Sequence, residues 1–257
     1  MRLKSGWIFR LVLSASVPFA LVACGSDEPT AEDYDDVAAA VAPLVVGDNG
    51  DTASMDDALS VSTGDLAPGL TRSGEGSVRG SRGGVSYSYD VSCLDGAGDA
   101  QTSCNSETDT ASVNVAWDGD FNTLRYDTSL SRTGSWTLTG ITGATAVLDG
   151  EGTFDVDSEF QSLDGNRRRT YMLSYAAEYE GVLIDTATRQ AVGGRAFFEI
   201  AADRTASNRF RDVEASFDIE ADVTFNDDGS ATLILDGERI YELESNSSGV
   251  EVSVNPS

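Results

Sequence analysis

Strict alternation of apolar and polar residues from Val213 to Phe225 limits the fold of this chain more than any other feature. Seven apolar residues alternate there with six polar ones. A β-strand points successive side chains to opposite faces, so the pattern predicts a long strand with one buried and one solvated face. Shorter segments with the same period predict further strands at Val85–Cys93, Val113–Trp117, Leu124–Leu130, Trp136–Thr139, Phe154–Phe160, Tyr171–Tyr179 and Arg195–Ile200.

The connections between these strands are short, and several contain Asp-Gly, as at Asp118-Gly119, Asp149-Gly150 and Asp164-Gly165. The run from Asn226 to Gly229 predicts a hairpin turn, which leads to a return strand through Ala231, Leu233 and Leu235. Parallel pairs need long crossovers, so short connections indicate an antiparallel meander. We therefore expect an all-β fold over residues 85–257, with a curled sheet that is either barrel-like or a two-layer sandwich.

The segment before this domain is different in character. Residues 24–33 are acidic and predict a flexible tether, and residues 34–84 predict short helices followed by a connector. One short helix is expected within residues 37–42 and should end at Pro43; Ser54 is expected to cap a second helical turn. The run from Ser73 to Gly84 is rich in glycine and serine and is expected to be irregular. These short helices should cover an open edge or mouth of the sheet.

Residues 1–23 have the three parts of a secretory signal: basic Arg2, Lys4 and Arg10, an apolar run from Leu11, and small residues at its end. The sequence Leu21-Val22-Ala23-Cys24 resembles the lipobox of bacterial lipoproteins. The resemblance implies that residues 1–23 are removed, that the Cys24 thiol is diacylated and that its new amine is acylated. Two or more acyl chains anchor a protein stably. It also implies a lipid-anchored protein of the bacterial cell envelope. The outer membrane is the expected location, and the protein could lie on either its periplasmic or its surface face.

The charge and composition exclude several classes of protein. The formal net charge is −26, and removal of residues 1–23 would make it −29, with Lys4 lost as the only lysine. The chain contains no histidine, which excludes Ser-His-Asp and Cys-His nucleophile pairs and zinc sites that use histidine. A strongly acidic chain is also a poor partner for nucleic acid. No motif for a cofactor is present.

Past Cys24, the only cysteines are Cys93 and Cys104, with ten residues between them. An exported pair of this kind predicts a disulfide; a metal site is the alternative, but two thiols supply only half of a zinc site.

Acidic residues repeat every second position at Asp155, Asp157 and Glu159 and at Glu214, Asp218, Glu220 and Asp222. We interpret them as solvated strand faces, with cation binding or catalysis by paired carboxylates as alternatives. The segments Asp118–Asn122 and Asp95–Asp99 each match only part of a calcium loop, and no metal site is predicted. The cluster Arg167-Arg168-Arg169 is expected to pair with acids across strands, and Tyr171, Tyr175 and Tyr179 are expected to pack in the core.

These observations favour a non-catalytic binding or structural domain on a lipid anchor, with an envelope protein or glycan as its partner. The alternatives are a polysaccharide hydrolase that uses carboxylates and a carrier of an apolar ligand in a half-barrel. A hydrolase requires a desolvated carboxyl group in a cleft. A carrier requires an apolar cavity inside the sheet.

Overall fold

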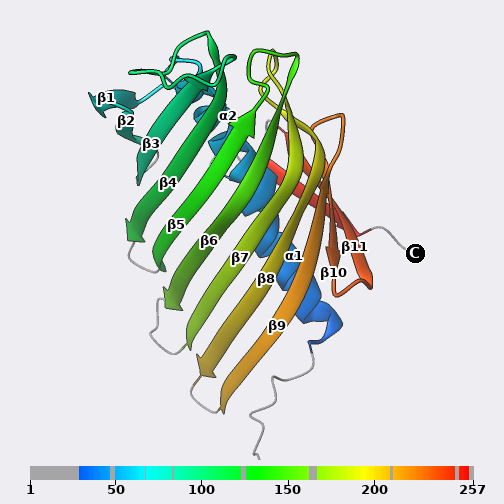
Figure 1. The fold of residues 1–257 in the computed structure, drawn as a ribbon. Helices are drawn as coiled ribbons and strands as arrows, with labels where there is room; N and C mark the ends of the chain where they lie inside the picture. Colours follow the sequence, from blue (N-terminus) through cyan, green and yellow to red (C-terminus); the bar gives the residue numbers. More distant parts are fainter. Residues whose placement is uncertain are drawn as a thin grey trace, which may run out of the picture.

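The computed structural model describes residues 29–46, 50–66, 68–82, 84–122, 126–161, 167–208, 211–246 and 249–254, so Cys24 lies outside the described residues. The described chain forms two helices and one 12-stranded antiparallel sheet in which each strand pairs with the next along the sequence (Figure 1). The elements are α1 (Ala31–Val46), α2 (Asp51–Ser62), β1 (Leu70–Gly74), β2 (Ser77–Arg82), β3 (Val85–Asp95), β4 (Thr108–Asn122), β5 (Tyr126–Thr139), β6 (Thr145–Gln161), β7 (Arg167–Asp185), β8 (Ala191–Asn208), β9 (Arg211–Phe225), β10 (Ala231–Leu235), β11 (Arg239–Asn246) and β12 (Gly249–Val254).

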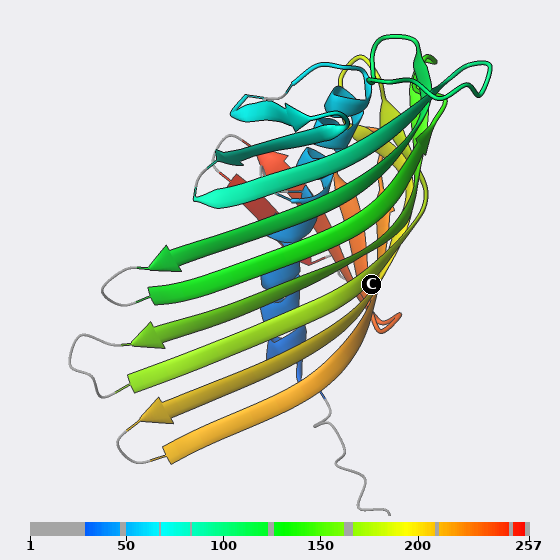
Figure 2. The same ribbon diagram turned by 60° about the vertical axis from the view of Figure 1, so that its left-hand side comes forward.

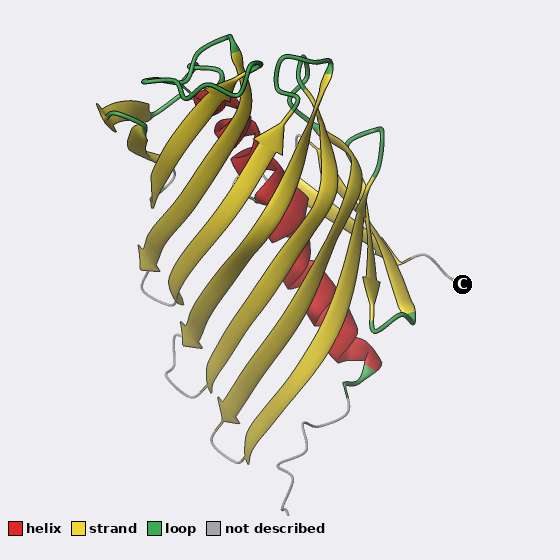
Figure 3. Ribbon diagram, in the orientation of Figure 1, coloured by secondary structure: helices red, strands yellow, loops and turns green. Residues whose placement is uncertain are grey.

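The predicted antiparallel meander is confirmed, but the expected closure is wrong. The sheet is open and single-layered, and β1 and β12 form its two edges. The helices lie across one face of the sheet, called here the inner face, and α1 and α2 follow each other along it in Figure 3. Because the helices bury the apolar side chains of that face, the sheet needs neither closure nor a second sheet. The fold is therefore mostly β rather than all-β, and the helices cover a face rather than an edge.

Both helices are longer than expected. Pro43 lies inside α1, which continues to Val46. A proline removes one helical hydrogen bond, but Val37, Val41 and Val45 share a stripe that is fully buried against the sheet, whereas Pro43 is exposed. Ser54 is not the cap of α2. The N-cap is Gly50, and the Ser54 hydroxyl donates a hydrogen bond to the Gly50 carbonyl instead.

The glycine-rich connector was also predicted wrongly, because residues 70–82 form the β1–β2 hairpin. Among the hairpin residues whose burial is described, Leu70 and Val78 are the buried ones, so the alternation is too weak to predict a strand. Asp118-Gly119 and Asp149-Gly150 lie inside β4 and β6 rather than in turns. The segments expected at Leu124–Leu130 and Trp136–Thr139 belong to the single strand β5, with Leu124 outside the described residues. Asp164-Gly165 lies outside them too.

The two faces of the sheet differ as the alternation predicts. Inner-face residues of β9, such as Phe217, Ile219 and Val223, are buried, whereas the acidic residues between them are exposed. In Figure 2, the ends of β4–β9 at the left extend beyond the helices. At that end the inner face is less covered, and Phe160 is 39% exposed. No helix among the described residues is long and apolar enough to span a membrane.

Candidate functional site

A charged pair is buried between α2 and the inner face of the sheet. Arg132 on β5 is 2% exposed and Asp51 at the start of α2 is fully buried. The Arg132 Nη2 atom lies 2.5 Å from Asp51 Oδ1. The hydroxyl of Tyr179 donates a hydrogen bond of 2.7 Å to Asp51 Oδ2, and that of Tyr175 donates one of 3.3 Å to Oδ1. Both oxygens of the Asp51 carboxylate therefore have a hydrogen-bonding or ion-pair partner.

Two tryptophan rings enclose the guanidinium of Arg132. Its central carbon lies 4.7 Å from the ring of Trp117 and 5.2 Å from that of Trp136. Such cation–π contacts are favourable when the cation is desolvated. A side chain at Gly134 would meet the Trp136 ring at 3.1 Å, so glycine is the residue that lets this indole lie back over its own strand. The indole N–H groups of both tryptophans are buried and have no acceptor among the described residues.

Burial and charge act in opposite directions on this cluster. Burial raises the pKa of Asp51, and the charge of Arg132 and the tyrosine hydroxyls oppose that rise. Desolvation by itself would lower the pKa of Arg132, but the combined attraction of Asp51 and of the nearby tyrosines exceeds that effect, so the pKa is raised. Burial, followed by Asp51, raises the pKa of Tyr175 and Tyr179 well above the usual value. Arginine keeps its proton, so the pair can hold α2 against β5 and β7.

Sequence reasoning missed this cluster. Tyr175 and Tyr179 were correctly expected in the core, and Tyr171 is partly buried beside them. Arg132 was not singled out, although it shares the inner-face parity of Leu130 and Trp136. A single arginine at an apolar position of an alternating strand is the signal that could have identified it.

Other aspartates of the helices also bond to the sheet. The hydroxyl of Tyr89 donates to Asp57 at 2.8 Å, and that of Tyr241 donates to Asp35 at 2.8 Å. Arg204 lies 2.7 Å from Asp33. We call these contacts, together with those of Asp51, the aspartate seam. It joins both helices to strands from β3 to β11.

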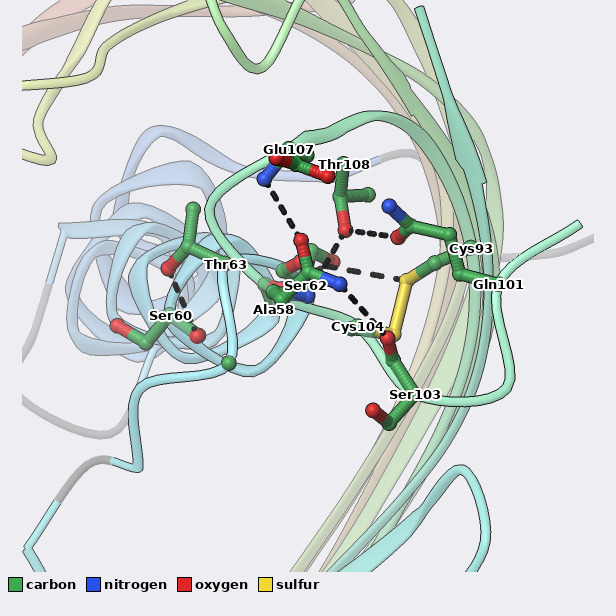
Figure 4. The surroundings of a disulfide bond; sticks show 12 residues. Ala58, Ser60, Ser62, Thr63, Cys93, Gln101, Ser103, Cys104, Glu107 and Thr108 are labelled. Atoms are coloured by element: carbon green, nitrogen blue, oxygen red, sulfur yellow. Dashed lines mark hydrogen bonds between the residues drawn. A yellow bond between two sulfur atoms is a disulfide. The ribbon is translucent and has the colours of Figure 1, made fainter. Parts of the chain in front are cut away.

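The predicted disulfide is present between Cys93 and Cys104. Figure 4 shows it beside Ser62, at the end of α2, and Cys93 Sγ lies 4.0 Å from the Ser62 carbonyl oxygen. Within the loop that it closes, the Asp95 carboxylate accepts hydrogen bonds from the backbone N–H groups of Ala97 and Asp99. The bridge therefore fastens a polar loop against the second helix.

The outer face of the sheet carries the acidic repeats. Asp155, Asp157, Glu214, Asp218, Glu220 and Asp222 are exposed there, and Glu159 is partly exposed. Arg168 pairs with Glu159 across strands, as expected, while Arg169 is exposed and the Arg167 side chain lies outside the described residues. The open hollows on this face include two with volumes of about 880 and 460 Å³. Phe197 and Glu178 help to line the larger one, and Asp118 and Asp155 help to line the smaller one.

The partial calcium loop at Asp118–Asn122 is part of the extended strand β4, so Asp118 and Asp120 lie in a row along one face rather than around one ion. Among the described residues, no three acidic or cysteine side chains are placed to hold a metal ion. In comparisons with known proteins, no family model, curated protein or solved structure matches this chain.

Proposed function

We propose that this chain is a non-catalytic binding domain held at a bacterial envelope membrane by lipid on Cys24. The observation that supports the non-catalytic part is the covered inner face. The helices lie on it, and the aspartate seam uses its buried charges to hold them. Asp51 is desolvated, as a hydrolase would require, but it is bonded to Arg132 and does not line either hollow of the outer face.

The covered inner face also disfavours an apolar carrier. Both hollows described above lie on the outer face of the sheet, where their linings include many carboxylates. An apolar ligand would instead need the space that Val37, Val41 and Val45 of α1 occupy. In the described part of the chain, the surface left for a partner is the outer face, the strand edges and the less covered end of the inner face near Phe160.

Metabolic labelling with radioactive palmitate tests the anchor. The wild-type chain should take up label, and Cys24→Ser should remain unprocessed and unlabelled. A Cys93→Ala/Cys104→Ala variant is the matched control, because it removes the other two cysteines and should keep the label. Absence of label from the wild-type chain would contradict the anchor.

Amide hydrogen exchange tests the covered face separately. The amides of α1 and α2 should exchange slowly, at rates close to those of the central strands. Rapid exchange throughout both helices would indicate that they leave the sheet, and would favour a gated hydrolase or a carrier instead.

A further inference from the structure

Strand β9 has an open edge over more than half of its length. Strand β8 pairs with it from Arg211 to Thr224, but β10 pairs only with residues 221–225. At Glu220, the Asp236 backbone N–H donates to the carbonyl at 2.8 Å, and the Asp236 carboxylate accepts from the backbone N–H at 2.8 Å. The chain then turns back into β11. Among the described residues, no strand pairs with residues 211–219 on that side; they form the lower end of β9 in Figure 1.

The alternation of an antiparallel strand determines which backbone groups face the open side. Glu220 and Asp222 direct theirs toward Asp236 and β10. At every second residue before Glu220, the backbone N–H and C=O groups point to the same side. These residues are Asp218, Ser216 and Glu214. No described residue bonds to those N–H and C=O groups. An edge of this length, about 30 Å at 3.3 Å per residue, is a template for an added strand.

The side chains along this edge specify the chemistry of such a strand. On the outer face, Glu214 and Asp218 are exposed on either side of Ser216. Their neighbours across β8 are Thr205, Asp203 and Ala201, none of which is basic. On the inner face, Phe217 and Ile219 are buried and Ala215 is partly buried. An added strand would meet unneutralised carboxylates on one face and an apolar rim on the other.

We propose that the open edge of β9 binds an extended segment of a partner protein with lysine or arginine at alternate positions and apolar residues between them. Its basic residues would lie beside Glu214 and Asp218, and its apolar residues would extend the row of Ala215 and Phe217. The proposal rests on the proposed binding function and names the partner's chemistry. A second copy of this chain fits poorly, because an antiparallel pair centred on Ser216 would place Glu214 opposite Asp218 of the copy.

The probe is an eight-residue peptide of alternating lysine and valine with both ends blocked, added to the full chain in detergent. At low salt it should bind and slow hydrogen exchange at Glu214, Ser216 and Asp218. The same peptide methylated on the backbone nitrogens that face β9 keeps its charge but cannot donate hydrogen bonds to the strand. It should bind at least tenfold more weakly.

Variants of the chain locate the site. Ser216→Pro removes a backbone donor on the open side without removing a bond to β8, and should weaken binding at least tenfold. Ser216→Ala is its matched control and should bind as the wild type does. Asp218→Asn should weaken binding several-fold. Asp222→Asn should weaken peptide binding less, because Asp222 lies on the same face but in the part of β9 that β10 already pairs with.

Equal binding of the methylated and unmethylated peptides would overturn the proposal, since charge on the outer face would then explain the binding. Absence of binding at low salt would also overturn it, as would dimerisation that Ser216→Pro abolishes, because the edge would then serve a second copy. These results can be distinguished from failure of the proposed function. That failure would be detected by palmitate labelling and by amide hydrogen exchange of the two helices.

Discussion

At the scale of single residues, the helices are held to the sheet by aspartates that meet tyrosine and arginine side chains. The Asp51–Arg132 pair is the most deeply buried of these contacts. Removing one partner of a buried ion pair leaves an uncompensated charge, whereas replacing both by apolar residues is often tolerated. The pair should therefore behave differently in single and double variants.

We expect Arg132→Met to lower the free energy of unfolding by about 3–5 kcal/mol at neutral pH. The loss should shrink at acidic pH, because burial raises the pKa of Asp51 and a protonated carboxyl group no longer needs a counterion. The double variant Arg132→Met/Asp51→Leu should lose less than Arg132→Met alone. Urea unfolding at several pH values measures these differences. Arg168→Met, which breaks the exposed pair with Glu159, is the control and should change stability little.

The tyrosines predict loss of stability at alkaline pH. Burial and the hydrogen bond to Asp35 raise the pKa of Tyr241 to about 12, and burial raises that of Tyr171 to about 12. A group whose pKa is raised on folding contributes stability that is complete below its unfolded pKa, near 10, and is lost as pH rises toward the folded value. Stability should therefore fall between about pH 10 and pH 12.

Tyrosinate absorbance and urea unfolding can follow this loss together. Lys4 is the only lysine, so lysine titration hardly interferes. Tyr241→Phe should show a shallower fall with pH than the wild type. Titration of Tyr241 and Tyr171 near pH 10 in the folded protein would contradict the argument.

At the scale of elements, the disulfide joins the end of β3 to a loop that packs on α2. Replacing both Cys93 and Cys104 by alanine should lower the free energy of unfolding by about 3 kcal/mol, because the unfolded chain gains freedom. The amides near Ser62 should exchange faster, since the loop lies against them. Chemical reduction of the wild type should reproduce both effects. Free thiols in a non-reduced mass spectrum of the exported protein would contradict the bridge.

The predictability of the elements follows the strength of the alternation. Long strands with bulky apolar residues, such as β9, were predicted well. The β1–β2 hairpin was missed because six of its 13 positions are glycine or serine and few are apolar. Asp-Gly in β4 and β6 was mistaken for turns because the pairing partners that keep the strands extended are not visible locally. The Asp51–Arg132 pair was missed because its members come from distant segments that only the folded sheet brings together.

At the scale of the whole molecule, acidic residues predominate on the outer face. Glu199 lies directly opposite Glu220, and Glu151 opposite Glu178, and like charges in that position repel. We expect the melting temperature to rise between about 10 mM and 500 mM monovalent salt, as the screening length falls from about 30 Å to a few ångströms. Calcium and magnesium at equal ionic strength should give the same melting curves, because screening depends on ionic strength and not on the identity of the cation.

A charge variant separates this repulsion from other effects of salt. Glu199→Gln should raise the melting temperature at low salt more than at high salt, because it removes one of two facing charges. Glu107→Gln, in the exposed loop before β4, is the matched control and should raise it less. A melting temperature that does not depend on salt would contradict the repulsion.

The meander also determines the order in which the molecule can be completed. Each strand pairs with its neighbour in sequence, so the sheet can grow from one hairpin to the next as the chain is made. Helix α1 cannot be seated in that order, because Tyr34 and Asp35 bond to Asp236 and Tyr241, near the other end of the chain. The first helix to be synthesised therefore keeps its apolar stripe uncovered until almost the last strand exists. A chain truncated before β10 should thus have most of its hairpins but should lack the contacts with Asp236 and Tyr241 that hold its N-terminal helix.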